Sequence, residues 1–237
     1  MIKFIKRDLI LNLAVSSIAL GFSLGVKISS IVFLAPLIIT IILNSLTNPA
    51  KPIKQLFLSM TVVFITLHIV APYIFLDFPA FKSNLDYEGG LAIGKIPVFY
   101  TRQFINTIPI IFQLEKILPY TLGPIFLIFA LMGFIFLILD LSKKPKIPLI
   151  LIAVAFLSLF TSNAFLFAKW TRFIAPTFPF FSIFAVLFLQ KFIRKKKTLI
   201  YSLTAILHIS TTLWTTAFFS IYPNPDIRIT ASQCLRS

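Results

Sequence analysis

Acidic residues are scarce in this sequence: only 7 of its 237 residues are Asp or Glu, against 22 Lys or Arg. The four charged residue types together make up 12% of the chain, about half of their share in a soluble domain. Hydrophobic residues make up 58%, Phe alone contributes 28 residues, and the mean hydropathy is +0.97. So little polar surface cannot cover a water-soluble fold, and the composition predicts an integral membrane protein.

Cysteine is almost absent as well. The single cysteine, Cys234, excludes an internal disulfide and any Cys-based zinc cluster. The sequence also contains no His-Glu-x-x-His zinc motif and no glycine-rich phosphate loop ending in Lys. We therefore predict no metal site and see no sign of a cofactor, although the sequence does not decide whether a divalent metal assists a bound substrate.

Apolar stretches of transmembrane length occur seven times along the chain. A helix needs about 20 apolar residues to cross the hydrocarbon, because each residue rises about 1.5 Å and every backbone polar group must find a partner within the helix. We predict an all-α integral membrane fold, a single multi-pass domain over residues 1–237. Its seven transmembrane helices are expected at Leu9–Val26, Ile28–Thr47, Gln55–Leu76, Ile117–Leu139, Ile147–Ala168, Phe173–Gln190 and Thr198–Pro225.

The connecting segments differ in positive charge. When the seven spans alternate, one set of connections has 13 Lys or Arg in 29 residues and the other has 9 in 57. Because the more positive set is normally cytoplasmic, we expect the N-terminus inside and the C-terminus outside the plasma membrane. The excess of positive charge, +15 in total, is then explained without a nucleic-acid partner.

One connection, Asp77–Lys116, is long and is expected on the outer side. Forty residues exceed the usual length of a connection, and such loops are commonly functional. Gly89-Gly90, Gly94 and Pro97 are expected to break it in the middle. The stretch Pro97–Glu115 has regularly spaced apolar residues that favour a short helix on the membrane surface.

Three cations lie at the ends of spans on this outer side. Lys27 alone separates the first two spans, and Lys169 and Arg172 precede the sixth. If the stretch from Lys169 to Arg172 is helical, the spacing of three residues puts these two cations on one helix face. One interpretation is that the three residues are anchors at headgroup depth. The other is that they bind an anionic, lipid-linked substrate, because the planar Arg guanidinium matches phosphate oxygens.

Four motifs follow one another along the chain: Gly21-x3-Gly25-x-Lys27, Asp77-Phe78-Pro79-x-Phe81 with Tyr100-Thr101-Arg102-Gln103-Phe104-x2-Thr107-x-Pro109, Arg172-Phe173-x2-Pro176-x2-Pro179, and Tyr222-Pro223-x-Pro225-x2-Arg228-x2-Ala231-Ser232. Together they resemble the membrane domain of prokaryotic GT-C glycosyltransferases, the lipid-carrier-dependent branch related to protein O-mannosyltransferases. The resemblance covers nearly the whole chain.

This resemblance implies transfer of a sugar from a polyprenyl-phosphate carrier to a lipid, glycan or protein acceptor on the outer face of the membrane. Lys27, Lys169 and Arg172 would stabilise the departing lipid phosphate, and Tyr100 and Gln103 would orient hydroxyl or phosphate groups. The partners would be membrane lipid and the lipid-linked sugar.

The sequence departs from the family at its beginning. Family members carry the catalytic carboxylate in their first outer loop, with further spans before the glycine-rich hairpin, whereas here only eight residues precede the first predicted span. The resemblance therefore predicts a fragment of a larger enzyme that does not transfer sugar alone. Asp77 and Glu88, both in the outer loop, are the acids that could substitute as the base.

A non-enzymatic membrane protein, such as a transporter subunit or an assembly partner, is the alternative. Transporter sites tend to lie near the bilayer midplane on broken helices. The predicted spans carry no acid or base there apart from His68 and His208, which we interpret as neutral, hydrogen-bonded helix residues. Of the helix breakers inside the spans, Pro36 and Gly133 are the two that would fit a transporter, and neither is accompanied by a charge. The polar candidates gather at one side of the membrane instead, which favours chemistry at that surface.

The charge distribution yields a test of topology. A reporter fused after Lys146 should be cytoplasmic and one fused after Ser237 external, because the two sets of connections differ in positive charge. Reporter activity measured on both sides checks this. Both termini on the same side would remove the seven-span arrangement.

Overall fold

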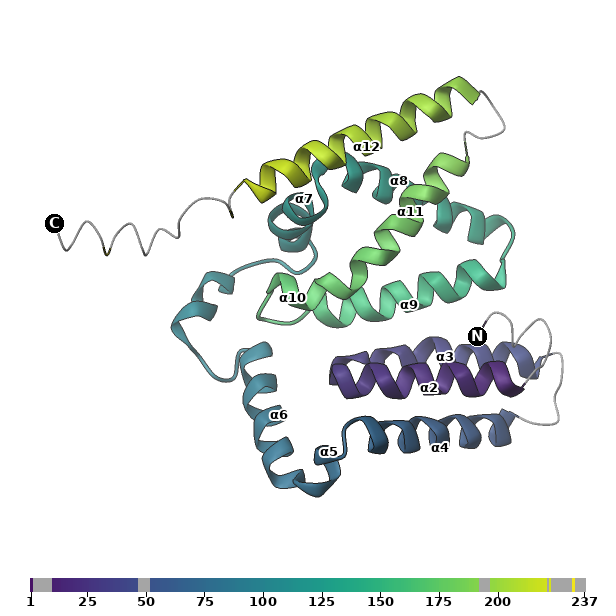
Figure 1. Ribbon diagram of the computed structural model, residues 1–237, viewed down its shortest axis with the longest axis vertical. Coiled ribbons are helices and arrows are strands. Elements are labelled where there is room, and N and C mark those ends of the chain that lie inside the picture. Colours follow the sequence, from purple (N-terminus) through teal and green to yellow (C-terminus); the bar gives the residue numbers. More distant parts are fainter. Residues whose placement is uncertain (2–9, 47–51, 192–196, 221, 223–231, 233–237) are drawn as a thin grey trace. The chain divides into compact units, whose positions relative to one another are not determined.

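The structure, a computed structural model, describes residues 1, 10–46, 52–191, 197–220, 222 and 232, and these residues contain helices and no strand (Figure 1). Their principal elements are α2 (Ile10–Val26), η1 (Ile28–Phe33), α3 (Leu34–Ser45), α4 (Pro52–Val70), α5 (Tyr73–Leu76), α6 (Phe78–Ala92), η2 (Phe99–Phe104), η3 (Gln113–Ile117), α7 (Leu118–Leu122), α8 (Pro124–Lys143), α9 (Ile147–Ala164), α10 (Thr171–Ile174), η4 (Ala175–Thr177), α11 (Phe178–Gln190) and α12 (Lys197–Phe219).

Helical stretches long and apolar enough to cross a membrane occur five times among the described residues. They correspond to the second to sixth predicted spans, and they confirm the all-α class and the multi-span apolar character. They are Ile28–Ser45, Pro52–Val70, Pro124–Lys143, Ile147–Ala164 and Thr171–Gln190.

The predicted count of seven spans is not confirmed. The first candidate, α2, is a 17-residue apolar helix in the described part of the chain, and the residues before Ile10 lie outside it. The last, α12, is 23 residues long but carries Ser, Thr and His side chains along its length. Neither is among the five.

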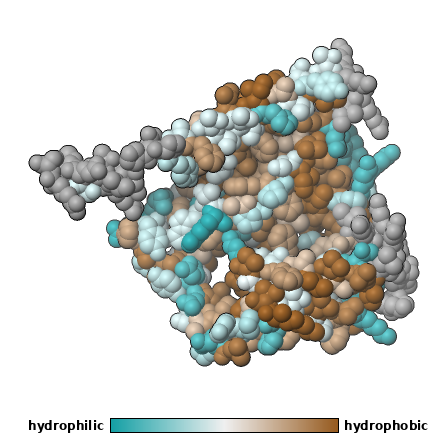
Figure 2. All heavy atoms as spheres, viewed as in Figure 1, coloured by the Kyte–Doolittle hydropathy of each residue, from teal (hydrophilic) through white to brown (hydrophobic). Residues whose placement is uncertain are grey.

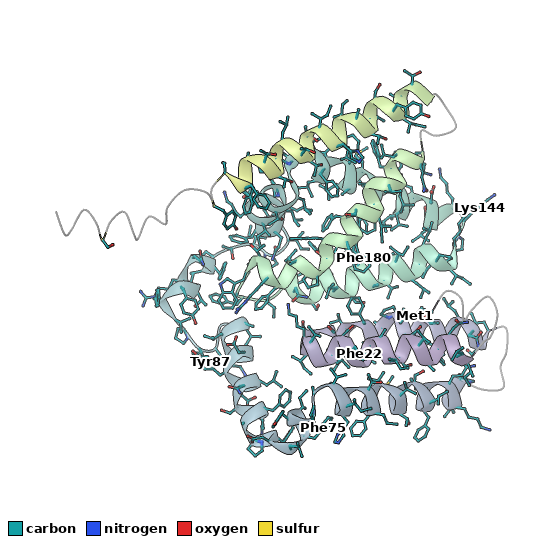
Figure 3. All side chains as sticks on the ribbon, in the orientation of Figure 1. Met1, Phe22, Phe75, Tyr87, Lys144 and Phe180 are labelled. Atoms are coloured by element: carbon teal, nitrogen blue, oxygen red, sulfur yellow. The ribbon has the colours of Figure 1, made fainter. Side chains whose placement is uncertain are left out.

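Large apolar side chains cover the outer surfaces of the helices. Phe22, which Figure 3 labels on α2, is 52% exposed, and brown, apolar atoms dominate the visible face of the region formed by α2, α3 and α4 (Figure 2). A soluble monomer rarely exposes such continuous apolar surface. These surfaces are suited to contact with lipid chains.

Two compact units make up the chain. The first comprises Met1–Gln113 with Ile138–Phe180, and the second comprises Leu114–Leu137 with Phe181–Ser237. The first unit contains α2 to α6, η2, α9 and α10. The second contains α7, α12 and most of α8 and α11.

In the first unit, α2 packs closely on α4 through glycine. A Cβ on Gly21 would lie 2.6 Å from Thr66 Cβ and 2.9 Å from the carbonyl oxygen of Val63, and a Cβ on Gly25 would lie 2.7 Å from a methyl carbon of Val70. The spacing Gly21-x3-Gly25 places both glycines on one helix face, the arrangement that lets membrane helices approach closely. Its packing role explains the glycines without any catalytic function.

The same glycines enclose Ser23 in a Gly-x-Ser-x-Gly sequence, a pattern shared with hydrolase nucleophiles. Such a nucleophile requires a sharp turn from a strand into a helix. Ser23 instead lies inside α2, and its hydroxyl donates to the carbonyl oxygen of Ala19 at 2.8 Å. The pattern therefore carries no nucleophile here.

In the second unit, glycine again marks close contacts. A side chain on Gly133 of α8 would overlap the backbone of Phe184 in α11, so the two helices touch at this point. Gly123 has a φ of +83°, and the Trp214 side chain lies against it. This left-handed residue ends α7, so the span expected at Ile117–Leu139 starts at Pro124 instead.

The outer connection differs from the prediction. Gly89 and Gly90 do not break it: both lie within α6, and the chain turns at Gly94, whose φ is +79°. The helix expected within Pro97–Glu115 is the short 3₁₀ helix η2, and the longer regular helix is α6 upstream. The local reason is the Asp77 carboxylate, which accepts a hydrogen bond from the Ala80 amide at 3.2 Å and caps α6.

Glycine packing in the first unit gives a stability prediction. Gly21→Ala should destabilise the fold by about 1–3 kcal/mol, since the added methyl group meets the Val63 backbone and the branched carbon of Thr66. Gly89→Ala is the matched control, because nothing lies within 4 Å of its added Cβ and alanine favours a helix. Thermal unfolding in detergent measures both, and equal melting temperatures for the two variants would contradict the close α2–α4 contact.

Candidate functional site

Arg172 lies where the chain re-enters a helix after α9. Trp170 has an extended backbone (φ −70°, ψ 143°), α10 makes one turn, and η4 follows before α11 begins. Pro176 and Pro179 fall in this stretch and remove backbone donors, which accounts for the irregular entry.

Aromatic rings and a carboxylate surround the Arg172 guanidinium. Its central carbon lies 4.5 Å from the centre of the Trp170 ring and 5.4 Å from that of Phe173, distances suited to cation–π attraction. One of its nitrogens lies 3.9 Å from an oxygen of Glu88 on α6. The Arg172 side chain is still 64% exposed. The guanidinium is thus oriented by its neighbours and remains open to a ligand.

Lys27, 145 positions earlier, reaches the same place. It is the extended residue between α2 and η1, and its ammonium donates to the carbonyl oxygen of Arg172 at 3.1 Å and lies 5.5 Å from the Phe173 ring. Burial and, to a lesser degree, the Arg172 charge lower the pKa of Lys27 below its usual value of 10.5. Two of the three predicted cations therefore meet in the structure.

An open pocket of about 540 Å³ lies beside Arg172. Glu88 and Leu91 from α6, Tyr100 from η2, and Trp170 and Arg172 line it, and all five belong to the first unit. The Tyr100 ring lies 6.0 Å from Trp170 and meets Phe99 edge to face at 5.1 Å. The pocket is thus lined by charged, hydrogen-bonding and aromatic groups.

Lys169 and Arg172 were expected to share a helix face only if the stretch between these two residues is helical, and that condition is not met. Lys169 precedes α10 in a non-helical segment, so the i,i+3 relation does not apply. Lys169 is only 5% exposed, and its ammonium donates a hydrogen bond to the carbonyl oxygen of Phe167 at 3.3 Å. Burial lowers the pKa of Lys169 below 10.5.

Of the remaining candidate residues, Gln103, Asp77 and His208 make local hydrogen bonds, whereas Glu88 lines the pocket. The Gln103 amide donates to the carbonyl oxygen of Tyr100 at 3.0 Å and so stabilises η2. Asp77 caps α6, as described above, whereas Glu88 lines the pocket. His208, predicted to be a hydrogen-bonded helix residue, has its Nδ1 2.8 Å from the carbonyl oxygen of Thr204.

Leu91 and Trp170 line the pocket but were not predicted from the sequence, and Trp170 makes more of the aromatic contacts. It contacts Tyr100, Phe104, Phe173 and the Arg172 guanidinium, so it is the centre of the aromatic cluster. Its position between two cations in Lys169-Trp170-Thr171-Arg172 was the available signal, because indole is the best partner for a cation.

In the part of the chain that the structure describes, no three His, Cys, Asp or Glu side chains lie close enough together to bind a metal ion. Comparison of the chain with protein-family models, with curated proteins and with solved structures finds no match.

Burial of Lys169 predicts a pH-dependent stability. Between the lowered pKa and 10.5 the folded protein binds fewer protons than the unfolded protein, so stability rises with pH across that window. Lys169→Met should melt at a higher temperature than the wild type at pH 7, and this advantage should shrink as the pH approaches 10.5. Thermal unfolding in detergent at several pH values measures it.

The control is Lys82→Met on α6, since Lys82 is exposed. It should change neither the melting temperature nor its pH dependence. A Lys169→Met variant that is less stable than the wild type throughout the range would show that the hydrogen bond to Phe167 outweighs the cost of burying the charge.

Proposed function

We propose that this chain is a membrane glycosyltransferase, or the membrane part of one, that binds a polyprenyl-phosphate sugar on the outer face of the membrane. The supporting observation is that the Arg172 guanidinium lines an open pocket with Glu88 and Tyr100, while the ammonium of Lys27, distant in sequence, contacts the backbone carbonyl of the same arginine. A lipid-linked sugar phosphate needs each of these groups: cations for the phosphate and polar and aromatic groups for the sugar.

The depth of the two cations supports a lipid substrate. Lys27 lies between the apolar helix α2 and the span Ile28–Ser45, and Arg172 lies at the start of the span Thr171–Gln190. Both are therefore at the ends of apolar helices, where the headgroups begin. A polyprenyl phosphate would present its phosphate at this depth while its chain remains in the hydrocarbon.

The proposed reaction follows from the resemblance. The oxygen of an acceptor hydroxyl attacks the anomeric carbon, the bond from that carbon to the phosphate oxygen breaks, and the bonding electrons stay with the phosphate. The hydroxyl proton passes to a carboxylate acting as general base. Of Asp77 and Glu88, only Glu88 lines the pocket. Negative charge grows on the leaving phosphate, so cations beside it lower the barrier.

The transporter alternative depended on helix breakers inside the spans. Pro36 lies in the first turn of α3, where a missing amide donor costs little. Gly133 permits the contact between α8 and the Phe184 backbone. Packing and helix geometry thus account for both residues, which favours the surface site over a midplane transport site.

Arg172 is the residue to test. The measurement is binding of the lipid-linked sugar donor, because binding does not depend on which residue acts as general base. Arg172→Ala should weaken binding of a polyprenyl-phosphate sugar by about 10- to 100-fold, because a hydrogen bond to a charged group contributes about 1.5–3 kcal/mol. Arg172→Lys should lose part of the affinity, since lysine keeps the charge but not the two-pronged geometry. Tryptophan fluorescence, with Trp170 beside Arg172, measures the titration.

The matched control is Arg102→Lys, the same substitution at an exposed arginine in η2 that is not among the pocket's lining residues. Its affinity should equal that of the wild type. Wild-type affinity in Arg172→Ala would show that the residue is a headgroup anchor, and the proposed site would be abandoned.

A further inference from the structure

We propose that the pocket beside Arg172 is a sugar subsite, with the Tyr100 ring as its stacking platform and the Glu88 carboxylate as a filter against acidic sugars. This inference rests on the proposed function, because it assumes that Arg172 holds the phosphate of the lipid-linked donor. The subsite would bind the sugar of the donor, and the expected sugars are neutral or amino sugars, not uronic acids.

The walls of the pocket match the two kinds of surface on a sugar ring. Tyr100, Trp170 and Leu91 supply apolar and aromatic surface, and Glu88 and Arg172 supply charged hydrogen-bonding groups. A pyranose has C–H faces that pack on aromatic rings and a rim of hydroxyls that hydrogen-bond to carboxylates. The pocket volume of about 540 Å³ lies within the range of small-molecule sites.

Tyr100 is the ring with a face available to a ligand. Arg172 already stacks on Trp170 at 4.5 Å, whereas Tyr100 is 42% exposed. Its backbone is held by the hydrogen bond that the Gln103 amide donates to its carbonyl oxygen at 3.0 Å, and its ring contacts Phe99 and Trp170. A ring that is held in place before binding loses little entropy when a sugar stacks on it.

Glu88 gives the pocket its selectivity. Its carboxylate is 62% exposed and lies 3.9 Å from Arg172, so a sugar attached to a phosphate at Arg172 comes within its reach. A carboxylate accepts hydrogen bonds from hydroxyls and attracts an amino group, but it repels the carboxylate of a uronic acid. Among the described residues that line the pocket, Arg172 is the single cation, and in the proposed complex it binds the phosphate.

The test compares two lipids with each variant: a sugar-free polyprenyl phosphate and the same lipid carrying a neutral hexose. Tyr100→Ala and Tyr100→Leu should both bind the hexose lipid about 3- to 10-fold more weakly, the range expected for loss of one aromatic contact. Both should bind the sugar-free lipid as the wild type does. Tyr100→Phe should bind both lipids normally, because it keeps the ring.

Tyr87→Ala is the matched control, since Tyr87 is a half-exposed tyrosine on α6 (Figure 3) that is not among the pocket's lining residues. It should leave both affinities unchanged. Tyr100→Leu keeps the bulk of the side chain, so the test remains valid if Tyr100→Ala does not fold.

Glu88→Gln tests the filter separately. In the wild type a lipid carrying a uronic acid should bind at least about 10-fold more weakly than the neutral hexose lipid, and Glu88→Gln should remove most of that difference because one repulsive charge is gone.

The outcomes separate the two proposals. Wild-type binding of both lipids by Arg172→Ala would reject the proposed function itself. If Arg172→Ala weakens both lipids while the Tyr100 variants change neither, or change both equally, the phosphate site stands and the sugar platform is wrong. Undiminished discrimination in Glu88→Gln would reject the filter.

Discussion

Hydrocarbon offers no hydrogen-bond partner to a backbone amide, and this constraint decides where the protein can place its polar chemistry. Within the apolar stretches the backbone is helical. Polar side chains from different segments can therefore approach one another most easily where the helices end. Two such points are Lys27, extended between α2 and η1, and Trp170, extended before α10. The candidate site is built at these two interruptions.

Helix positions were predictable where composition alone controls them. The span expected to begin at Ile147 begins there, because a charged segment gives way abruptly to apolar residues. The start at Ile117 was wrong, since the break at Gly123 depends on a left-handed turn packed against Trp214, 91 positions later. Nothing in the local sequence near Gly123 reports that contact.

Glycine illustrates the same limit in the outer connection. Gly89 and Gly90 are adjacent and were predicted to break the chain, yet they lie near the end of a capped helix. The cap at Asp77 and the preceding residues offset the cost of glycine there. Gly94 was placed in the same predicted break, and it is the one whose left-handed backbone turns the chain.

For the site, sequence position identified the right class of residue but not its partners. Lys27 and Arg172 were selected as cations at span ends on the outer side that could bind an anionic substrate, and the Lys27 ammonium contacts the Arg172 carbonyl oxygen. Lys169 was selected by the same argument and is buried against Phe167 instead. The spacing of the cations does not encode whether a lysine at a span end reaches a distant segment, as Lys27 does, or binds a nearby carbonyl oxygen, as Lys169 does.

Charge balance bears on the proposed binding of an anion at this site. Lys27 and Arg172 contribute two positive charges and Glu88 contributes one negative charge. The Glu88–Arg172 pair, at 3.9 Å with both side chains more than 60% exposed, contributes less than about 1 kcal/mol. Burial already lowers the pKa of Lys27, so its positive charge is held at a cost in free energy. An incoming phosphate would relieve that cost and would replace a weak contact at Arg172 with a two-pronged one. The carboxylate thus keeps the guanidinium in position without closing the site to a stronger anion.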